Sequence, residues 1–204
     1  MKSTSGLTVA VLAGGKSRRF GSPKYLAPFH SGTLLDSVIH TASQISDHII
    51  LIAGQLQFSP AENIPLYKDI YLDCGPLGGI YTALHYSADT LLAILPCDMP
   101  LMDAATYHIL RDRISPGHPV AALSHRGLEP LVSIWPVQPS LPVVAKNLER
   151  GKYSICKTLQ ELKATTVDFQ VLRQDYRPEI FSNINYPTDL LQVEAYREHR
   201  YELG

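Results

Sequence analysis

A short glycine-rich and basic segment near the start of the chain has the residue types of a phosphate-binding loop. The adjacent glycines Gly14 and Gly15 are followed in the same segment by the basic residues Lys16, Arg18, Arg19 and Lys24. Adjacent glycines let backbone N–H groups approach an anion closely, and cationic side chains then neutralise its charge. The spacing matches neither the Walker A loop nor the dinucleotide fingerprint G-x-G-x-x-G. The segment therefore predicts a polyphosphate site of another type, with a surface turn of solvated charges as the alternative.

Asp98 is a second candidate, because it lies on a stiff turn directly after an apolar run. The run 90–95 is followed by Pro96-Cys97-Asp98-Met99-Pro100, so prolines flank the carboxylate on both sides. Magnesium in proteins is usually held by one or two carboxylates together with substrate phosphates. Asp98 could instead cap a helix that begins near Asp103, although Asp103 is better placed for that role. A basic loop and a metal carboxylate together indicate nucleotidyl or phosphoryl transfer, in which positioning and charge neutralisation supply most of the rate.

Alternating strand and helix patterns must position these groups. Short apolar runs predict strands at 7–13, 48–53, 90–95, 120–123 and 131–135, with an edge strand at 165–169. Helical periodicity and capping residues predict helices at 33–44, 76–87, 104–113, 141–150, 152–162 and 187–200. This alternation predicts an α/β fold, a Rossmann-like doubly wound and mostly parallel sheet with helices on both faces. Ligands of such sheets bind at the carboxyl ends of the strands, where both candidate segments lie.

Composition and charge narrow the class of protein. The chain has 204 residues, of which 45% are apolar, and 18 basic residues stand against 19 acidic ones. This length and apolar content predict one domain over 1–204 and exclude a disordered chain. The balanced charge excludes a general polyanion binder, so we expect no nucleic acid as partner.

We also expect no membrane partner and a cytoplasmic location. No apolar run reaches the length of about 18 residues that spans a membrane. The run 7–13 leads directly into charged residues, unlike a signal peptide. The three cysteines are widely spaced and form no disulfide or metal-binding pattern, which is typical of thiols in a reducing compartment.

Four segments, taken together and in order, resemble the molybdenum cofactor guanylyltransferase family. They are Leu12-Ala13-Gly14-Gly15-x-Ser17-x-Arg19-Phe20-Gly21-x-x-Lys24, Asp69 with Gly75-Pro76-Leu77-Gly78-Gly79-Ile80, Pro96-Cys97-Asp98-Met99-Pro100, and Phe181-Ser182-Asn183-Ile184-Asn185-Tyr186-Pro187-Thr188-Asp189-Leu190. Each segment alone is common among nucleotidyltransferases, whereas the four together are more specific. The resemblance spans nearly the whole chain and implies a nucleotide-diphospho-sugar-transferase-like fold. It implies a nucleotide half at about 1–103 and a pterin or acceptor half at about 104–204.

The resemblance also implies a reaction and a set of site residues. GTP and a molybdopterin cofactor would give molybdopterin guanine dinucleotide and pyrophosphate, with Mg²⁺ as the metal. The nucleotide would be held by Leu12, Ala13, Gly14, Gly15, Gly21, Lys24, Asp69 and Asp98. Lys24, Arg19 and Asp98 would be catalytic, with Asp98 binding Mg²⁺, and the acceptor would lie near Gly75, Gly79, Asn183 and Asn185. Transient contact with molybdoenzymes or their chaperones is a further expectation.

Two positions depart from the family pattern. Pro23 stands where the family commonly has an acidic residue, and Gly54 stands where it usually has an asparagine near the guanine. Without a side chain at position 54, Gln55 or a backbone group would have to contact the base, so guanine and cytosine both remain open. The Gly14-Gly15 pair favours the guanylyl branch. The alternatives are molybdopterin cytidylyl transfer, nucleotidyl transfer to a sugar or isoprenoid phosphate, and a non-catalytic nucleotide-binding or partner module.

Other polar and aromatic residues have simpler interpretations. The eight histidines show no metal-site spacing. Glu129 either faces the pterin side of the site or is a loop carboxylate. The tyrosines at 67, 71, 81 and 86 are expected to pack at the core or its rim rather than to stack on a pterin.

Overall fold

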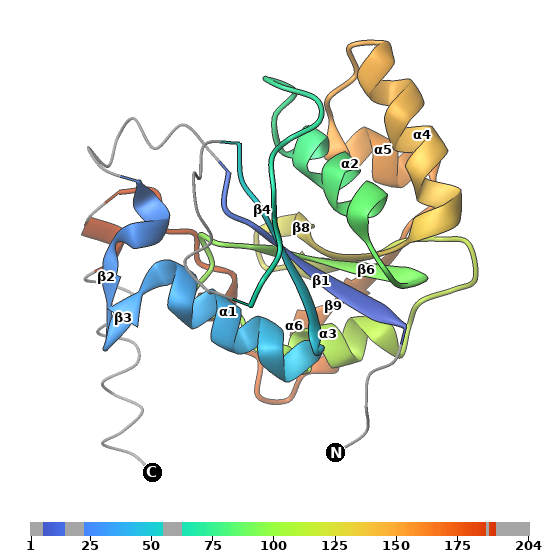
Figure 1. Ribbon diagram of the computed structural model, residues 1–204. Helices are drawn as coiled ribbons and strands as arrows, with labels where there is room; N and C mark the ends of the chain where they lie inside the picture. Colours follow the sequence, from blue (N-terminus) through green and yellow to red (C-terminus); the bar gives the residue numbers. More distant parts are fainter. Residues whose placement is uncertain (1–5, 15–22, 55–62, 187, 191–204) are drawn as a thin grey trace.

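The computed structural model describes residues 6–14, 23–54, 63–186 and 188–190 of the chain. Within these ranges it contains a seven-stranded sheet with the order β5-β4-β1-β6-β8-β7-β9 (Figure 1). The strands are β1 Leu7–Leu12, β4 His48–Ile52, β5 Leu66–Tyr67, β6 Leu91–Pro96, β7 Val120–Ser124, β8 Gly127–Pro136 and β9 Thr165–Asp168. Strand β8 is antiparallel to both of its neighbours, and the other pairs are parallel. The predicted mostly parallel sheet is confirmed.

Helices cover both faces of the sheet, as predicted (Figure 1). One face carries α1 Leu34–Ile45, α3 Ala104–Arg111 and α6 Phe169–Leu172, whose buried side chains join one hydrophobic cluster. The other face carries α2 Pro76–Tyr86, α4 Val137–Glu149 and α5 Ile155–Glu161, whose side chains form a second cluster. Strand β1 is buried at every residue, because its alternate side chains enter the two clusters in turn. No described helix has the length and apolar character needed to cross a membrane.

Helix α1 begins where its capping sequence predicts. The Thr33 side chain accepts a hydrogen bond from the backbone N–H of Asp36, at 3.2 Å. The Asp36 carboxylate accepts in return from the backbone N–H of Thr33, at 2.8 Å. This reciprocal capping box satisfies two backbone donors that the helix leaves unpaired. It also fixes the helix against the short hairpin of β2 Pro28–Phe29 and β3 Gly32–Thr33 that precedes it.

Several boundaries differ from the prediction. Helix α4 begins at Val137 rather than 141, because Pro139 falls in its first turn, where a missing N–H costs little. Pro142 lies inside the same helix. Strand β6 includes Pro96 as its last residue instead of stopping before it. Strand β8 starts at Gly127, earlier than the apolar run suggests.

Some short elements carry no clear sequence pattern. These are the two-residue strands β2, β3 and β5, the 3-10 helices η1 Lys24–Leu26 and η2 Pro178–Phe181, and α6, which replaces the end of the strand predicted at 165–169. Residues 188–190 are helical, as predicted, while the rest of the helix predicted at 187–200 lies outside the described residues. Gly15, Arg19 and Gly21 also lie outside them.

Candidate nucleotide-binding site

The carboxyl ends of β4, β1 and β6 meet at one edge of the sheet. Leu12 pairs with Ile52 of β4 on one side and with Pro96 of β6 on the other. The pairing continues past the strand ends, because the Ala13 N–H donates to the Ile52 carbonyl at 2.9 Å and the Cys97 N–H donates to the Leu12 carbonyl at 3.1 Å. Register therefore places the start of the glycine-rich segment between the end of β4 and the Asp98 turn.

Lys24 and Asp98 face each other at this edge although 74 positions separate them in the chain. The Lys24 Nζ lies 3.3 Å from the Asp98 Oδ2, and the two side chains are 15% and 30% exposed. Pro23 starts the 3-10 turn that carries Lys24, because its carbonyl accepts from the Leu26 N–H at 3.0 Å. Both side chains are partly open to solvent. The lysine can therefore bind a phosphate, and the carboxylate a metal ion, in place of their contact with each other.

Cys97, the neighbour of Asp98, is not a nucleophile in this arrangement. Its side chain is buried, and burial raises the pKa of the thiol to about 12, with the adjacent Asp98 charge adding to the effect. The thiolate is the reactive form of cysteine. A thiol with this pKa stays protonated near neutral pH and serves as packing.

The Asn-Ile-Asn segment reaches the Asp98 turn from the far end of the chain. The Ile184 N–H donates to the Asp98 carbonyl at 2.8 Å. The Ile184 side chain is fully buried in a small cluster with Ala27, Phe29 and Leu34. Asn183 is partly exposed and Asn185 exposed on either side of it. One isoleucine thus joins the turn of Asp98 to the segment that directly follows the 3-10 helix of Lys24.

Asp69 occupies a slot between two glycines on the other side of β1. It follows β5, the short strand that pairs with β4. A Cβ atom added at Gly54 would lie 3.2 Å from the Asp69 Oδ2, and one added at Gly79 would lie 3.6 Å from its Oδ1. The Asp69 side chain is half-buried, and desolvation raises its pKa. No hydrogen bond or ion pair to Asp69 is found among the described residues, so its two oxygens are available to a ligand with N–H or O–H donors.

Gly75 and Gly79, which were both assigned to the acceptor, have different surroundings in the structure. Gly79 lies in α2, where its Cβ position is 3.6 Å from Asp69 and from Leu12, two residues assigned to the nucleotide. Gly75 precedes the helix with a φ of 63°, a left-handed conformation that favours glycine. Its Cβ position has no atom within 4 Å. Gly75 is therefore open to a ligand, whereas Gly79 belongs to the slot around Asp69.

The remaining polar candidates have structural partners. Glu129 lies in β8, is buried, and accepts from the Ser124 hydroxyl at 2.7 Å and from the Arg126 guanidinium at 3.4 Å. Arg126 also donates to the Phe181 carbonyl. Tyr67 stacks on Tyr86 with ring centroids 3.9 Å apart, in keeping with the packing expected of these tyrosines. Among the described residues, no three His, Cys, Asp or Glu side chains gather as a metal cage.

Arg173 is a buried polar residue that sequence patterns did not indicate. Its side chain is only 7% exposed, and it pairs with Asp103 at 2.8 Å and with Asp175 at 2.6 Å. Asp103 is the N-cap of α3, as predicted, and accepts from the Thr106 N–H at 2.9 Å. An arginine in an irregular segment carries no periodic signal, so only the fold reveals this contact.

The fold and the site define a class of enzyme. A mostly parallel α/β sheet with Gly14 and Asp98 just past the ends of adjacent strands, and with Lys24 facing Asp98, is the architecture of a nucleotidyltransferase. The model of the MobA-like NTP transferase domain matches residues 9–165. The chain belongs to this family, and within it to the molybdenum cofactor guanylyltransferases that the sequence motifs indicated.

Similarity to individual relatives extends over nearly the whole chain. The probable molybdenum cofactor guanylyltransferase of Carboxydothermus hydrogenoformans is 32% identical over 197 residues, covering 94% of this chain and 98% of that protein. The molybdenum cofactor guanylyltransferase of Pasteurella multocida is 29% identical over 90% of this chain and 96% of its own length. The crystal structure of molybdopterin-guanine dinucleotide biosynthesis protein A from Archaeoglobus fulgidus superposes with a TM-score of 0.80 at 22% identity, covering 94% of this chain and 99% of that one. This last similarity shows that the two proteins share a fold.

Proposed function

We propose that this protein transfers GMP from GTP to a molybdopterin cofactor and releases pyrophosphate. The observation that carries the proposal is the Lys24–Asp98 contact of 3.3 Å at the sheet edge where Gly14 follows β1, in a chain of the guanylyltransferase family. In such a pair each residue has its own role, because the lysine can neutralise phosphate charge while the carboxylate holds a metal ion. We place the reaction in the cytoplasm, with the molybdoenzymes or their chaperones as recipients of the product.

Mg²⁺ is the metal we propose for this site. Asp98 supplies a hard, partly exposed carboxylate at the strand ends, and the described residues offer no further carboxylate cage around it. Magnesium commonly binds one or two protein carboxylates and completes its octahedron with water and substrate phosphates. The donor set therefore fits Mg²⁺ that arrives with the nucleotide. Bound Mg²⁺ would supply charge neutralisation at the triphosphate.

The protein's own residues orient the substrates and stabilise charge. The backbone at Leu12, Ala13 and Gly14 would hold the triphosphate, with Gly15, Arg19 and Gly21 as further proposed contacts. A phosphate oxygen of the acceptor attacks the α-phosphorus, the bond to the β-phosphate bridging oxygen breaks, and its electron pair leaves with pyrophosphate. Lys24 would stabilise the negative charge on the transferred phosphate. The attacking phosphate is already anionic, so the step needs no general base, and the protonated Cys97 thiol is consistent with that. The acceptor would lie near Gly75, Asn183 and Asn185.

Asp69 supports guanine as the base. The Watson–Crick edge of guanine presents two adjacent N–H donors, which a carboxylate can accept together. Cytosine presents one amino group beside a ring acceptor, which a carboxylate would repel. The slot at Gly54 and Gly79 leaves both Asp69 oxygens without a protein partner in the described part of the chain. In this chain, Asp69 would therefore supply the base contact that an asparagine at position 54 supplies elsewhere in the family.

Nucleotide preference can be tested by thermal shift. With Mg²⁺ present, GTP should raise the unfolding temperature more than CTP, ATP or UTP, because stabilisation follows RT ln(1 + [L]/Kd) for ligands of the native state. The same nucleotides are then tested without the metal. A larger shift with CTP would contradict guanylyl transfer and favour the cytidylyl alternative. No shift with any nucleotide would contradict the nucleotide site.

A side chain at position 54 should weaken GTP binding. In Gly54→Ala the new Cβ would crowd the Asp69 Oδ2 at 3.2 Å, a contact that the carboxylate can relieve only by moving. We expect roughly tenfold weaker GTP binding in calorimetry, about the effect of one lost hydrogen bond, and a larger loss in Gly54→Asn. The φ of Gly54 is not in the left-handed region, so the unfolding temperature should stay near the wild-type value. Tighter GTP binding by Gly54→Asn would show that the asparagine, not the glycine, suits this site.

A further inference from the structure

We propose that Arg173 is a positioning residue for the proposed transfer reaction, acting through Asp103 on the loop that carries Asp98. The inference rests on the proposed function, because its consequence is the placement of the metal-binding carboxylate. The loop runs from Cys97, at the end of β6, to Asp103, the N-cap of α3. It begins directly after β6 and ends at the first turn of α3, so the contacts along the loop and at Asp103 set where Asp98 points.

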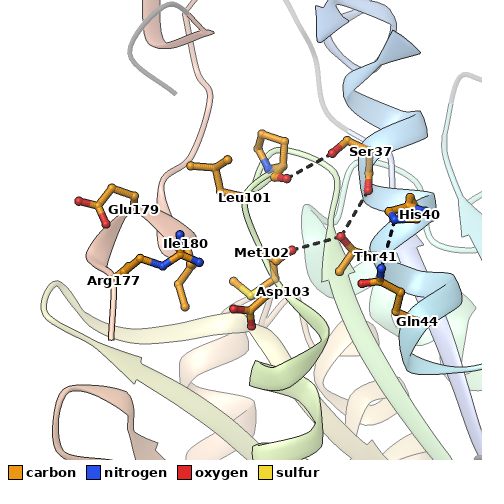
Figure 2. Close-up of a pocket in the computed structure, with 11 residues that line it drawn as sticks. Ser37, His40, Thr41, Gln44, Leu101, Met102, Asp103, Arg177, Glu179 and Ile180 are labelled. Carbon is orange, nitrogen blue, oxygen red and sulfur yellow. Dashed lines mark hydrogen bonds between the residues drawn. The ribbon is translucent and has the colours of Figure 1, made fainter. Parts of the chain in front are cut away.

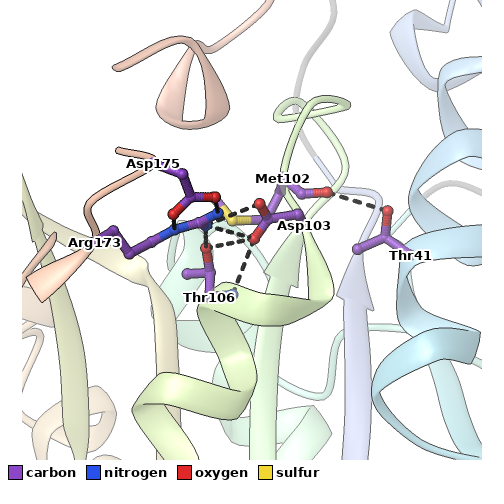
Figure 3. Close-up of polar contacts among 6 residues, drawn as sticks. All are labelled: Thr41, Met102, Asp103, Thr106, Arg173 and Asp175. Carbon is purple, nitrogen blue, oxygen red and sulfur yellow. Dashed lines mark hydrogen bonds and ion pairs between the residues drawn. The ribbon is translucent and has the colours of Figure 1, made fainter. Parts of the chain in front are cut away.

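Arg173 contacts the far end of the loop, at Asp103, through one nitrogen of its guanidinium (Figure 3). Its Nη1 donates to Asp103 Oδ1 at 3.0 Å and Oδ2 at 2.8 Å. Its Nε and Nη2 donate to Asp175 at 3.0 and 2.6 Å. Charged hydrogen bonds of this type combine strength with a fixed geometry. Asp103 is thereby held by the guanidinium and by the first turn of α3 at once.

The middle of the loop is held by hydrogen bonds from α1 (Figure 2) and by the side chains of Met99 and Met102, which are buried in the hydrophobic cluster on this face of the sheet. The Ser37 hydroxyl donates to the Pro100 carbonyl at 3.3 Å, and the Thr41 hydroxyl donates to the Met102 carbonyl at 3.2 Å. Residues 100–103 also line a cavity of about 460 Å³ between α1 and residues 177–180. Side chains that border an open cavity resist displacement less than a filled core does. The two hydrogen bonds from α1 and the two buried methionines therefore keep the loop in place together on this side.

The near end of the loop has its own anchor at Asp98. The carbonyl of Asp98 accepts from the Ile184 N–H at 2.8 Å, while its carboxylate faces Lys24. Thus Ile184, α1 and Arg173 hold the loop at different points, and none of these contacts uses the Asp98 carboxylate. Arg173 belongs to the half of the chain assigned to the acceptor, so its contact with Asp103 couples that half to the metal-binding loop.

The test uses two carboxylates that pair with the same arginine. In Asp103→Asn the helix cap survives, because asparagine caps as well as aspartate, but the ion pair to Arg173 is lost. In the control Asp175→Asn the same arginine loses its other partner, which is 72% exposed and lies outside the loop. Arg173→Lys retains the charge but has a single nitrogen in place of the three donor nitrogens of the guanidinium. Each full-length variant is measured for Mn²⁺ and GTP binding by calorimetry, for kcat and KM of pyrophosphate release with Mg²⁺, and for unfolding temperature.

We expect Asp103→Asn to weaken Mn²⁺·GTP binding and to lower kcat, each roughly tenfold, since small displacements of reacting groups carry effects of this size. Asp175→Asn should leave both within about twofold of the wild type, and Arg173→Lys should fall between them. Wild-type binding and kcat in Asp103→Asn, whatever its unfolding temperature, would overturn the proposal. An inactive wild-type protein that binds no GTP would instead contradict the proposed function itself, so the two failures are distinguishable.

Discussion

Replacing Asp98 with asparagine should slow pyrophosphate release from GTP by about 100-fold or more and leave the fold in place. The substitution keeps the shape of the side chain but removes the charge that would hold Mg²⁺ beside the phosphates. Loss of one such transition-state contact typically costs about 3 kcal/mol of barrier. The Asp98 side chain is 30% exposed and its main fold contact is made by its backbone carbonyl, so the protein should remain folded.

The matched variant is Lys24→Met, which removes the other charge of the 3.3 Å pair. Both variants are followed by pyrophosphate release, unfolding temperature and GTP titration. We expect the lysine variant to lose GTP affinity as well as rate, because the ammonium would contact the phosphates in the ground state. Wild-type rates in both variants would remove Lys24 and Asp98 from the catalytic site. A wild-type protein that binds GTP but releases no pyrophosphate with its acceptor would favour a non-catalytic binding module.

Asp69→Asn should change the preferred nucleotide from GTP to XTP. Asparagine has one acceptor and one donor where aspartate has two acceptors, so one of the two guanine N–H groups would meet another donor. Xanthine carries a carbonyl in place of the guanine amino group and restores complementarity. Hydrogen bonds to a charged group contribute about 2 kcal/mol each, so GTP affinity should fall roughly 30-fold. Equal losses for GTP and XTP would place Asp69 at the ribose instead of the base.

The pH dependence of GTP binding offers an independent check on Asp69. Burial raises the pKa of this carboxyl above its ordinary value of 3.8. Its contribution to folding is therefore largest at low pH and declines as pH rises through the raised pKa, because the native state binds the proton more tightly than the unfolded chain does. GTP affinity should change in the opposite sense, falling as acidification protonates the carboxylate. The loss of affinity at low pH should be absent when Asp69→Asn binds XTP. If the loss persisted, a group other than Asp69 would be responsible for it.

The main architecture could be predicted from local sequence because its elements are regular. Buried strands such as β1 are continuous apolar runs, and α1 carries both an apolar stripe and the Thr33–Asp36 capping box. The sequence also predicts that Gly14 and Asp98 lie at the same edge of the sheet. Each follows a strand, and parallel strands end on the same side. Short elements escaped prediction, because two residues such as Leu66 and Tyr67 have no period and pair only through the strand already in place.

Sequence patterns could not predict contacts between segments that are distant along the chain. Gly54 looked like the loss of a base contact, whereas the structure shows that its missing side chain makes room for the carboxylate of Asp69. The pairing of Arg173 with Asp103 joins residues 70 positions apart that no periodicity connects. Likewise, Glu129 could not be assigned before its partners Ser124 and Arg126 were placed around it.

The link between Ile184 and Asp98 has a consequence for the order of events during translation. Strands β1, β4, β5 and β6 leave the ribosome early and can pair as soon as they emerge, but β6 keeps an open edge until β8 arrives. The carbonyl of Asp98 lacks its hydrogen-bond donor for longer still, because Ile184 is synthesised after every strand of the sheet. A nascent chain can therefore complete its sheet while the Asp98 turn is unsecured. Such an intermediate would have the fold of the family before the Asp98 turn was secured, and we expect GTP to protect the chain only near the end of synthesis.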